Sequence, residues 1–173
     1  DIVIEEGFSI EKGENEQKRS CLIDLNGYAL TLKAVNTSKT AFSVGEGTSL
    51  TLQNGRLFRE NTGAQTASTG TIDTVAVDAI NGSVVMGGMT LKGFDCAVRV
   101  HDMDGEGAGN STVRITNCTL ESKEATIFIQ GDGSRSENVH TRLILQRSRI
   151  VSDYIGISGN GSSSTGDERW GTE

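Results

Sequence analysis

The sequence lacks the features that membrane-spanning and nucleic-acid-binding chains need. No apolar run reaches the roughly 18 residues of a membrane-spanning helix in this chain of 173 residues. Lys and Arg number 16 against 23 Asp and Glu, so the net charge is -7, and no Lys/Arg cluster is present. Because neutralised phosphates supply most of the affinity for nucleic acid, we do not expect this acidic chain to bind it.

Cysteine is scarce, and no targeting signal is recognisable. The three cysteines, Cys21, Cys96 and Cys118, cannot all pair within the chain, and no CxxC motif or Cys/His cluster predicts a zinc site. They are interpreted as small buried hydrophobic residues. The chain opens on a strand-like segment without a signal peptide and stops without a closing element. Residues 1–173 are therefore expected to form a single domain that is a piece of a longer solenoid.

What the sequence does contain is a repeat of short strand-like segments. Apolar and polar residues alternate in short runs, separated by Gly, Asn, Ser, Thr and Asp, and no segment supports a long amphipathic helix. Five segments share the template apolar-x-apolar-x-(Asn/Gly/Arg)-x-x-apolar. They begin at positions 23, 50, 84, 113 and 143, and a further strand-like segment follows each one. A spacing near 30 residues predicts a solenoid of stacked turns.

The template has a physical interpretation as three short parallel strands per triangular turn. Turns would lie about 4.8 Å apart, with alternate residues pointing inward. The Asn or Gly of the template would occupy a bend with positive φ, which these two residues adopt most readily. A further hypothesis places Asn54 and Asn117 in a side-chain ladder between turns. The predicted inward stack consists of Leu25, Leu52, Met86, Ile115 and Leu145.

Three segments resemble a known family. Residues 24–32 (Asp-Leu-Asn-Gly-Tyr-Ala-Leu-Thr-Leu) and 47–55 resemble rungs of right-handed parallel β-helices, the pectin-lyase-like superfamily. Residues 155–161 resemble a rung of large surface-anchored proteins of Gram-positive gut bacteria. The resemblance covers roughly 20–161. It implies an all-β, right-handed parallel β-helix, for which the template predicts about five coils, and a secreted or wall-displayed bacterial protein. Because the superfamily includes lyases, hydrolases, adhesins and spacers, the fold leaves the function open.

One corner of the predicted turn collects polar and acidic side chains. If Val44, Val77, Val100 and Ile129 are equivalent, the residues that follow them lie along one edge. The predicted ligand or cation contacts there are Asp78, His101, Asp102, Asp104 and Asp132. Such oxygens suit calcium, and two of the carboxylates could share a proton. Residues 102–107 resemble a shortened calcium loop without its distal Glu, but a solvated turn is the favoured interpretation. We predict no catalytic set, metal site or cofactor, with calcium as the alternative.

The outer faces are predicted to be ordinary sheet surface. Polysaccharide-cleaving β-helix enzymes usually gather several carboxylates on one outer face. Ten predicted outward positions on the first strand of the turns include a single carboxylate, Asp24. Phe58 and Phe94 are interpreted either as outward aromatic residues suited to stacking on sugars or as corner packing.

These patterns favour a non-catalytic extracellular or cell-wall-displayed module, a spacer or adhesin segment that presents loops to a host surface or glycan. The alternatives are a fragment of a carbohydrate-active enzyme, with Asp102, Asp104 and Asp132 as its acids, and a filament subunit whose turns stack end to end. Exposed strand edges and an open apolar stack favour aggregation. Adjoining turns or a partner chain are therefore expected at both ends.

Overall fold

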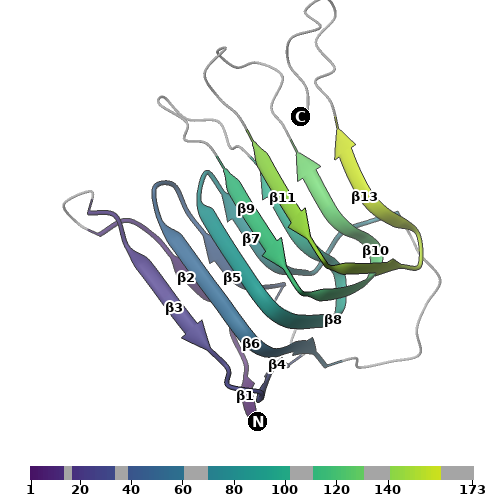
Figure 1. Cartoon of the computed structure of the whole chain (residues 1–173), viewed down its shortest axis with the longest axis horizontal. Coiled ribbons are helices and arrows are strands. Elements are labelled where there is room, and N and C mark those ends of the chain that lie inside the picture. The colour runs from purple at the N-terminus through teal and green to yellow at the C-terminus, as the bar shows by residue number, and fades with distance from the viewer. Residues whose placement is uncertain (14–16, 34–38, 61–69, 102–110, 131–140, 161–173) are drawn as a thin grey trace, which may run out of the picture.

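The chain forms a parallel β-solenoid. The computed structural model describes residues 1–13, 17–33, 39–60, 70–101, 111–130 and 141–160. Within these ranges it has strands and no helix, and every strand pairing in its 13-stranded sheet is parallel. Figure 1 shows the turns side by side from the purple N-terminal end to the yellow C-terminal end. The predicted fold class is confirmed.

The strands lie on three faces, and the chain visits face 1, face 2 and face 3 in order. The longer strands bend at corners and so contribute to more than one face. Face 1 contains β1 (Ile2–Ile4), β4 (Ala29–Leu32), the second half of β6 (Ser49–Arg59), the middle of β8 (Ser83–His101), the start of β10 (Thr119–Gln130) and β12 (Arg149–Ser152).

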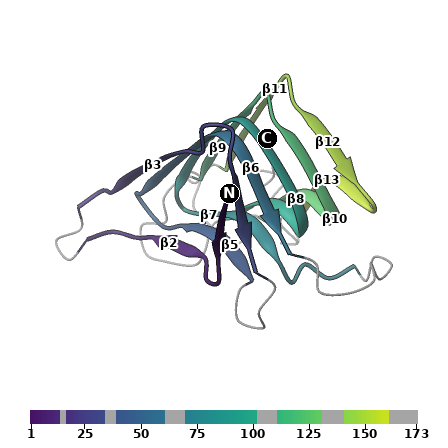
Figure 2. The same cartoon turned by 90° about the horizontal axis from the view of Figure 1, so that it is seen from below.

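Faces 2 and 3 complete each turn. Figure 2 shows β3, β9 and β11 along one side of the solenoid and β2, β5 and β7 along another. Face 2 contains β2 (Phe8–Ile10), β5 (Thr40–Val44), β7 (Val75–Ile80), the ends of β8 and β10, and β13 (Ile155–Asn160). Face 3 contains β3 (Ser20–Asp24), the starts of β6 and β8, β9 (Thr112–Thr116) and β11 (Arg142–Gln146).

Apolar side chains fill the axis of the solenoid. Alternate residues of each strand point inward, so equivalent residues of successive turns lie directly over one another. On face 3 the registers place Leu52 over Met86, Met86 over Ile115 and Ile115 over Leu145, as predicted. The first three of these side chains are fully buried, whereas Leu145, in the last described turn, is only partly buried. The interior is thus sealed in the middle turns.

The first turn differs from the prediction by two residues. Ile23, and not Leu25, pairs with Leu52. The corner from face 3 to face 1 is longer in this turn, and Leu25 turns into it. A Cβ built on Gly55 of the next turn would lie 2.3 Å from the Leu25 Cβ, so only glycine leaves the space that Leu25 occupies.

The corner from face 3 to face 1 is built on left-handed residues. The template position has positive φ in every turn, between 47° and 85°, as predicted. Its five residues are Gly27, Asn54, Gly88, Asn117 and Arg147. The predicted ladder of Asn54 with Asn117 is wrong, because the turn that carries Gly88 lies between them. The Asn54 side chain instead donates to the Asp24 carboxylate at 3.1 Å.

Candidate functional site

The edge predicted to contact a ligand follows face 2. Asp78 lies on β7 and His101 ends β8, whereas Asp102, Asp104 and Asp132 lie outside the described residues. Val100 is level with Ile129, as the prediction assumed. Val77, however, pairs with Val98 and Phe42, so it lies two residues out of the assumed alignment. Asp78 is therefore not level with His101.

The residue level with Asp78 is Arg99. The Arg99 guanidinium donates two hydrogen bonds to the carboxylate, from Nε to Oδ1 at 3.1 Å and from Nη2 to Oδ2 at 2.5 Å. Asp78 is only 3% exposed. The hydrogen bond to Asp78 is the main cause that raises the pKa of Arg99, and burial opposes it. In this bidentate arrangement Asp78 neutralises a cation that the chain itself supplies.

A buried thiol lies beside this pair. Burial raises the pKa of Cys96 to about 12, while the positive charge of Arg99 opposes the shift. Burial also raises the pKa of Cys118. A thiol with so high a pKa stays protonated near neutral pH and is a poor nucleophile and metal ligand. The interpretation of Cys96 and Cys118 as small buried residues is confirmed, whereas Cys21 is half-buried.

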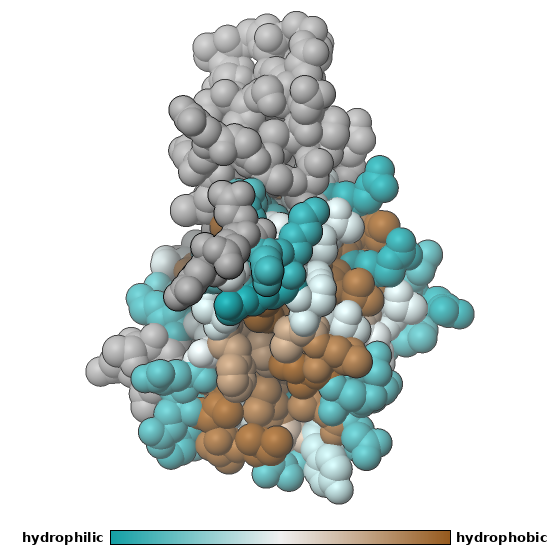
Figure 3. Space-filling model, turned by 90° about the vertical axis from the view of Figure 1, so that its left-hand side faces the viewer, coloured by the Kyte–Doolittle hydropathy of each residue, from teal (hydrophilic) through white to brown (hydrophobic). Residues whose placement is uncertain are grey.

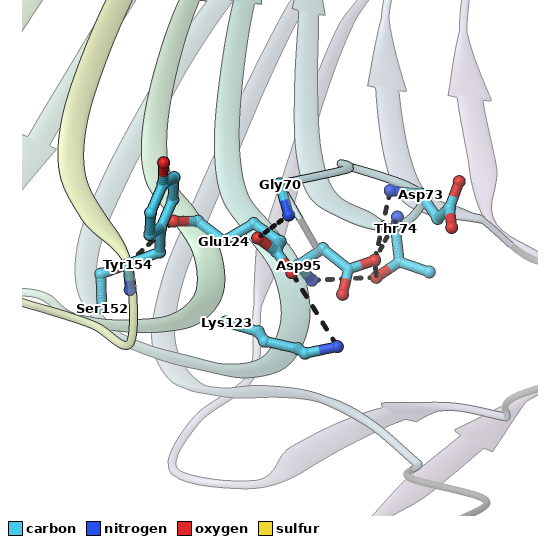
Figure 4. A network of polar contacts seen from close by, with 8 residues as sticks. All are labelled: Gly70, Asp73, Thr74, Asp95, Lys123, Glu124, Ser152 and Tyr154. Atoms are coloured by element: carbon cyan, nitrogen blue, oxygen red, sulfur yellow. Dashed lines mark hydrogen bonds and ion pairs between the residues drawn. The ribbon is translucent and has the colours of Figure 1, made fainter. Parts of the chain in front are cut away.

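A polar network that was not predicted from the sequence lies at the corner from face 1 to face 2 (Figure 4). The Asp95 carboxylate accepts hydrogen bonds from the Thr74 backbone N–H at 2.9 Å and the Thr74 hydroxyl at 2.8 Å. It also accepts a longer one, of 3.2 Å, from the Asp73 N–H. The Asp95 N–H donates back to the Thr74 hydroxyl at 2.9 Å. This reciprocal pair attaches the segment that enters β7 to the next turn.

Glu124 occupies the same corner one turn further on. Glu124 is 2% exposed, and its Oε2 accepts the N–H of Gly70 at 3.0 Å. Lys123 Nζ lies 3.9 Å from Oε1. The Ser152 hydroxyl of the following turn donates to the Glu124 carbonyl oxygen at 3.1 Å. Figure 4 shows these contacts in a row along the corner, so the network joins segments from four consecutive turns.

The chemistry of this corner is that of attachment between turns. A carboxylate that is partly or fully buried needs hydrogen-bond donors in place of the water that it has lost. Asp95 and Glu124 both accept hydrogen bonds from backbone N–H groups of the segment that precedes β7. Among the described residues, no three His, Cys, Asp or Glu side chains are grouped so that they could hold a metal ion.

The spacing of apolar residues in two successive turns was sufficient to predict that Asp95 and Glu124 lie at the same corner. Leu91 to Val98 and Leu120 to Ile127 span equal intervals, and both pairs of residues are in register. Asp95 and Glu124 lie at the same distance into those two intervals. An alignment of the corner residues themselves would have placed the two acids one above the other.

The exposed face 3 carries a second polar group. Asp24 accepts a hydrogen bond from the Gln53 amide at 2.8 Å and one from the Asn26 backbone N–H at 2.9 Å. The bond from Gln53 is the main cause that lowers the pKa of Asp24 from 3.8. Leu22, at 66% exposure, occupies the place in the outward ladder where Asp24 was expected.

The two phenylalanines proposed for sugar stacking differ from each other. Phe94 is 1% exposed, so it packs in the core and is not an outward aromatic residue. Phe58 points outward between Thr31 and Lys92, as predicted, and is half-buried. The Arg56 guanidinium carbon lies 6.0 Å from the centre of its ring. One face of this ring therefore already has a cationic neighbour.

An open hollow of about 390 Å³ lies at the N-terminal end of the solenoid, between β2 and β3. It is lined by Ser9, Ile10, Glu11, Arg19, Ser20 and Cys21. Charges of both signs and short polar side chains surround it.

Comparisons of the chain with protein-family models, with curated proteins and with solved structures gave no match. In the part of the chain that the structure describes, no helix has the length and apolarity to cross a membrane.

Proposed function

We propose that the chain is a non-catalytic extracellular β-solenoid module, a stiff spacer or adhesin segment that carries loops at its corners. The observation that supports the proposal is that the buried acids Asp78 and Glu124 bind groups of other turns. Asp78 is bound by Arg99 from the next turn, and Glu124 accepts the Gly70 N–H from the segment before β7. Carboxylates bound in this way connect one turn to another and stabilise their stacking, as a rigid support requires.

The continuity of the ladders supports the same proposal. Parallel pairing runs without a gap from β1 to β12 on face 1 and from β2 to β13 on face 2. Each turn is attached to its neighbours by backbone hydrogen bonds and by stacked apolar side chains. A structure of this kind holds the loops that leave its corners at fixed separations along the rod, as multivalent contact with a host surface or glycan requires.

The extracellular or cell-wall location and the membership of the pectin-lyase-like superfamily are also proposals. They are supported by the sequence resemblance of residues 24–32 and 47–55 to rungs of that superfamily, and of residues 155–161 to a rung of surface-anchored bacterial proteins. Antibody labelling of intact source cells, before and after treatment with an external protease, tests the location. Labelling that protease removes is expected, and labelling only after the cells are lysed contradicts it.

A polysaccharide panel separates the module from an enzyme fragment. The wild-type chain and the triple variant D102N/D104N/D132N are incubated with acidic and neutral polysaccharides, with calcium and with EDTA. We expect no new reducing ends or unsaturated products from either protein, and equal melting temperatures. Turnover by the wild type that the triple variant loses would contradict the proposal and favour the enzyme.

A glycan array tests the adhesin function directly. The fluorescently labelled chain is expected to retain a subset of glycans. Variants that shorten one corner segment at a time, within 34–38 or within 61–69, are expected to lose some of them while keeping the β-rich circular dichroism spectrum. A chain that retains no glycan and no host-cell surface is a spacer rather than an adhesin.

A further inference from the structure

The segment that leads into β7 binds a side chain two turns further along the rod. The N–H of Gly70, in this segment, donates to Oε2 of Glu124 at 3.0 Å. Glu124 lies in β10, at the corner that leads into its face 2 part. On face 2, β7 pairs with β8 and β8 pairs with β10. The hydrogen bond from Gly70 to Glu124 therefore joins two turns that have a third turn between them.

The turn between them is bound by the same segment. The Asp95 carboxylate, at the corner of β8, accepts the Thr74 N–H at 2.9 Å and the Asp73 N–H at 3.2 Å. The Asp95 N–H donates to the Thr74 hydroxyl at 2.9 Å. Figure 4 shows Gly70 directed toward Glu124 and Thr74 beside Asp95. Residues 70–74, called the clamp segment below, thus contact the corners of the next two turns.

A bulge in β10 places Glu124 for this contact. In the ladder between β8 and β10, Lys123 and Glu124 lie opposite the single residue Asp95. An extra residue of this kind redirects a side chain while the register continues on both sides of it. Glu124 is only 2% exposed. Because a buried carboxylate needs hydrogen-bond donors in place of water, the Gly70 N–H stabilises it in this position.

The clamp segment also ends a long connection, because β6 ends at Arg59 and β7 begins at Val75. A long connection that is attached only through its two strands adds closure entropy and no contacts. The hydrogen bonds from Gly70 and Thr74 to acids of later turns fix the last residues of this connection. The polar insertion at this corner therefore contributes to the stacking of the turns.

The other contacts between turns are of short range. Backbone ladders join each strand to the strands beside it, and the apolar stack acts between side chains in direct contact. Figure 3 shows hydrophobic residues in the middle of the molecule with hydrophilic residues on either side. In a solenoid whose contacts all lie between neighbours, one turn can open while turns beyond its neighbour stay folded.

We propose that the clamp segment makes the turns of β7, β8 and β10 open as one cooperative unit. Opening of any of these turns breaks a contact of the clamp segment, since its hydrogen bonds reach all three. The free energy needed to open the turn of β10 therefore includes a contact with the turn of β7, which is not its neighbour. This inference concerns how the rod opens and does not rest on what the rod binds.

Native-state hydrogen exchange followed by mass spectrometry tests the proposal. Peptides from β5, β7, the face 2 part of β8 and β10 report the opening of their turns separately. In the wild-type chain, the slowest amides of β7, β8 and β10 should exchange with one common dependence on low concentrations of urea, as members of one unit do. Amides of β5, in the turn before β7, should follow a different dependence.

A perturbation placed in one turn shows whether the other turns respond. Ile127 is fully buried on β10. Ile127→Val removes one methyl group and should speed the exchange of β10 amides several-fold. With the clamp segment bound, amides of β7 should speed up by the same factor, and those of β5 by less. A β7 that does not respond overturns the proposal, as does a β5 that responds by the same factor as β7.

Substitution of Glu124 removes the contact between the two outer turns of the unit. Glu124→Leu lacks the acceptor for the Gly70 N–H, whereas Glu124→Gln keeps an acceptor oxygen and is the matched control. The leucine variant should exchange its β10 amides about tenfold faster than the wild type. Ile127→Val added to Glu124→Leu should then speed up β10 and leave β7 unchanged. Added to Glu124→Gln, it should speed up both.

Two results in these variants overturn the proposal. A β7 that still responds in the Glu124→Leu background shows that the ladders alone couple the turns. A Glu124→Gln background that uncouples β7 from β10 shows that the hydrogen bond from Gly70 is not the link. If Glu124→Leu does not fold, the responses of β5 and β7 to Ile127→Val in the wild-type and Glu124→Gln chains still decide. Because the experiment measures opening and not glycan binding or turnover, its outcome is independent of the function tests above.

Discussion

Arg99 and Asp78 form a bidentate ion pair across two neighbouring turns, and Asp78 is only 3% exposed. The pair lies on the outward side of face 2, between strands β7 and β8. The sequence predicts a ligand contact at Asp78, whereas in the structure the guanidinium of Arg99 binds this carboxylate.

Removal of one member of this pair should destabilise the fold. Asp78→Ala leaves a partly buried guanidinium without its carboxylate, and we expect the free energy of unfolding to fall by about 3 kcal/mol. The double variant D78L/R99M, which removes both charges and keeps apolar volume, should be less destabilised than D78A. Urea unfolding followed by circular dichroism measures both. An unchanged midpoint for D78A would show that the pair contributes nothing.

The left-handed corner at Gly88 should tolerate asparagine but not a β-branched residue. Gly88 has φ of 62°, and its neighbour in the turn before, Asn54, has φ of 57°. Gly88→Val should lower the free energy of unfolding by about 1–2 kcal/mol or more, because this conformation brings Cβ too close to the backbone. Gly88→Asn is the matched control and should cost less. Equal thermal stability of the two variants would contradict the corner geometry.

The titration of Asp24 should depend on Gln53. Hydrogen bonds from Gln53, Asn26 and Asn54 lower the pKa of Asp24 below 3.8 in the folded protein. These bonds therefore stabilise the fold above pH 3.8, and their contribution is lost as the pH falls through the lowered pKa. Carbon NMR of the carboxyl group should show the pKa rise toward 3.8 in Gln53→Ala. The variant S49A on the same face is the control and should leave it unchanged.

The three thiols should differ in reactivity. Cys96, with a pKa of about 12, and the buried Cys118 should react slowly with an alkylating reagent near neutral pH. The half-buried Cys21 should react first. Mass spectrometry should find one modification per folded chain at early times, on Cys21, and three after denaturation in urea. Early modification of Cys96 in the folded chain would show that the middle turns open readily.

The spacing of the turns and the bends at the template position were predictable because they depend on local residue chemistry. Only Gly and Asn adopt positive φ easily, so Asn54, Gly88 and Asn117 marked the same corner in three turns. Arg147 fitted only through its position in the template. The outward ladder of face 1 was also predicted, and in it Lys92 forms an ion pair with Glu121 at 2.9 Å.

The register of two strands was not predictable from alternation alone. A shift by two residues keeps every inward residue inward, so Cys21 and Ile23 match Leu50 and Leu52 as well as Ile23 and Leu25 do. Only the length of the following corner decides between them. The same ambiguity misplaced Val77, and with it Asp78. A polar partner such as Arg99 depends on the exact register, so the candidate site was less predictable than the fold.

The alignment of Gly82, Ser83 and Thr112 implies that the fold can lose or gain complete turns without a change in the strand register. Thr112 N–H donates to the Gly82 carbonyl at 3.1 Å, and Thr112 is the ladder partner of Ser83. Excision of residues 83–111 would join Gly82 to a residue that already lies at the corresponding point of the next circuit. Leu52 would then meet Ile115, and Val77 would meet Ile127. A cut of half this size would instead bring strands from different sides together, so duplication or loss of complete circuits is the route by which such a rod can grow or shrink.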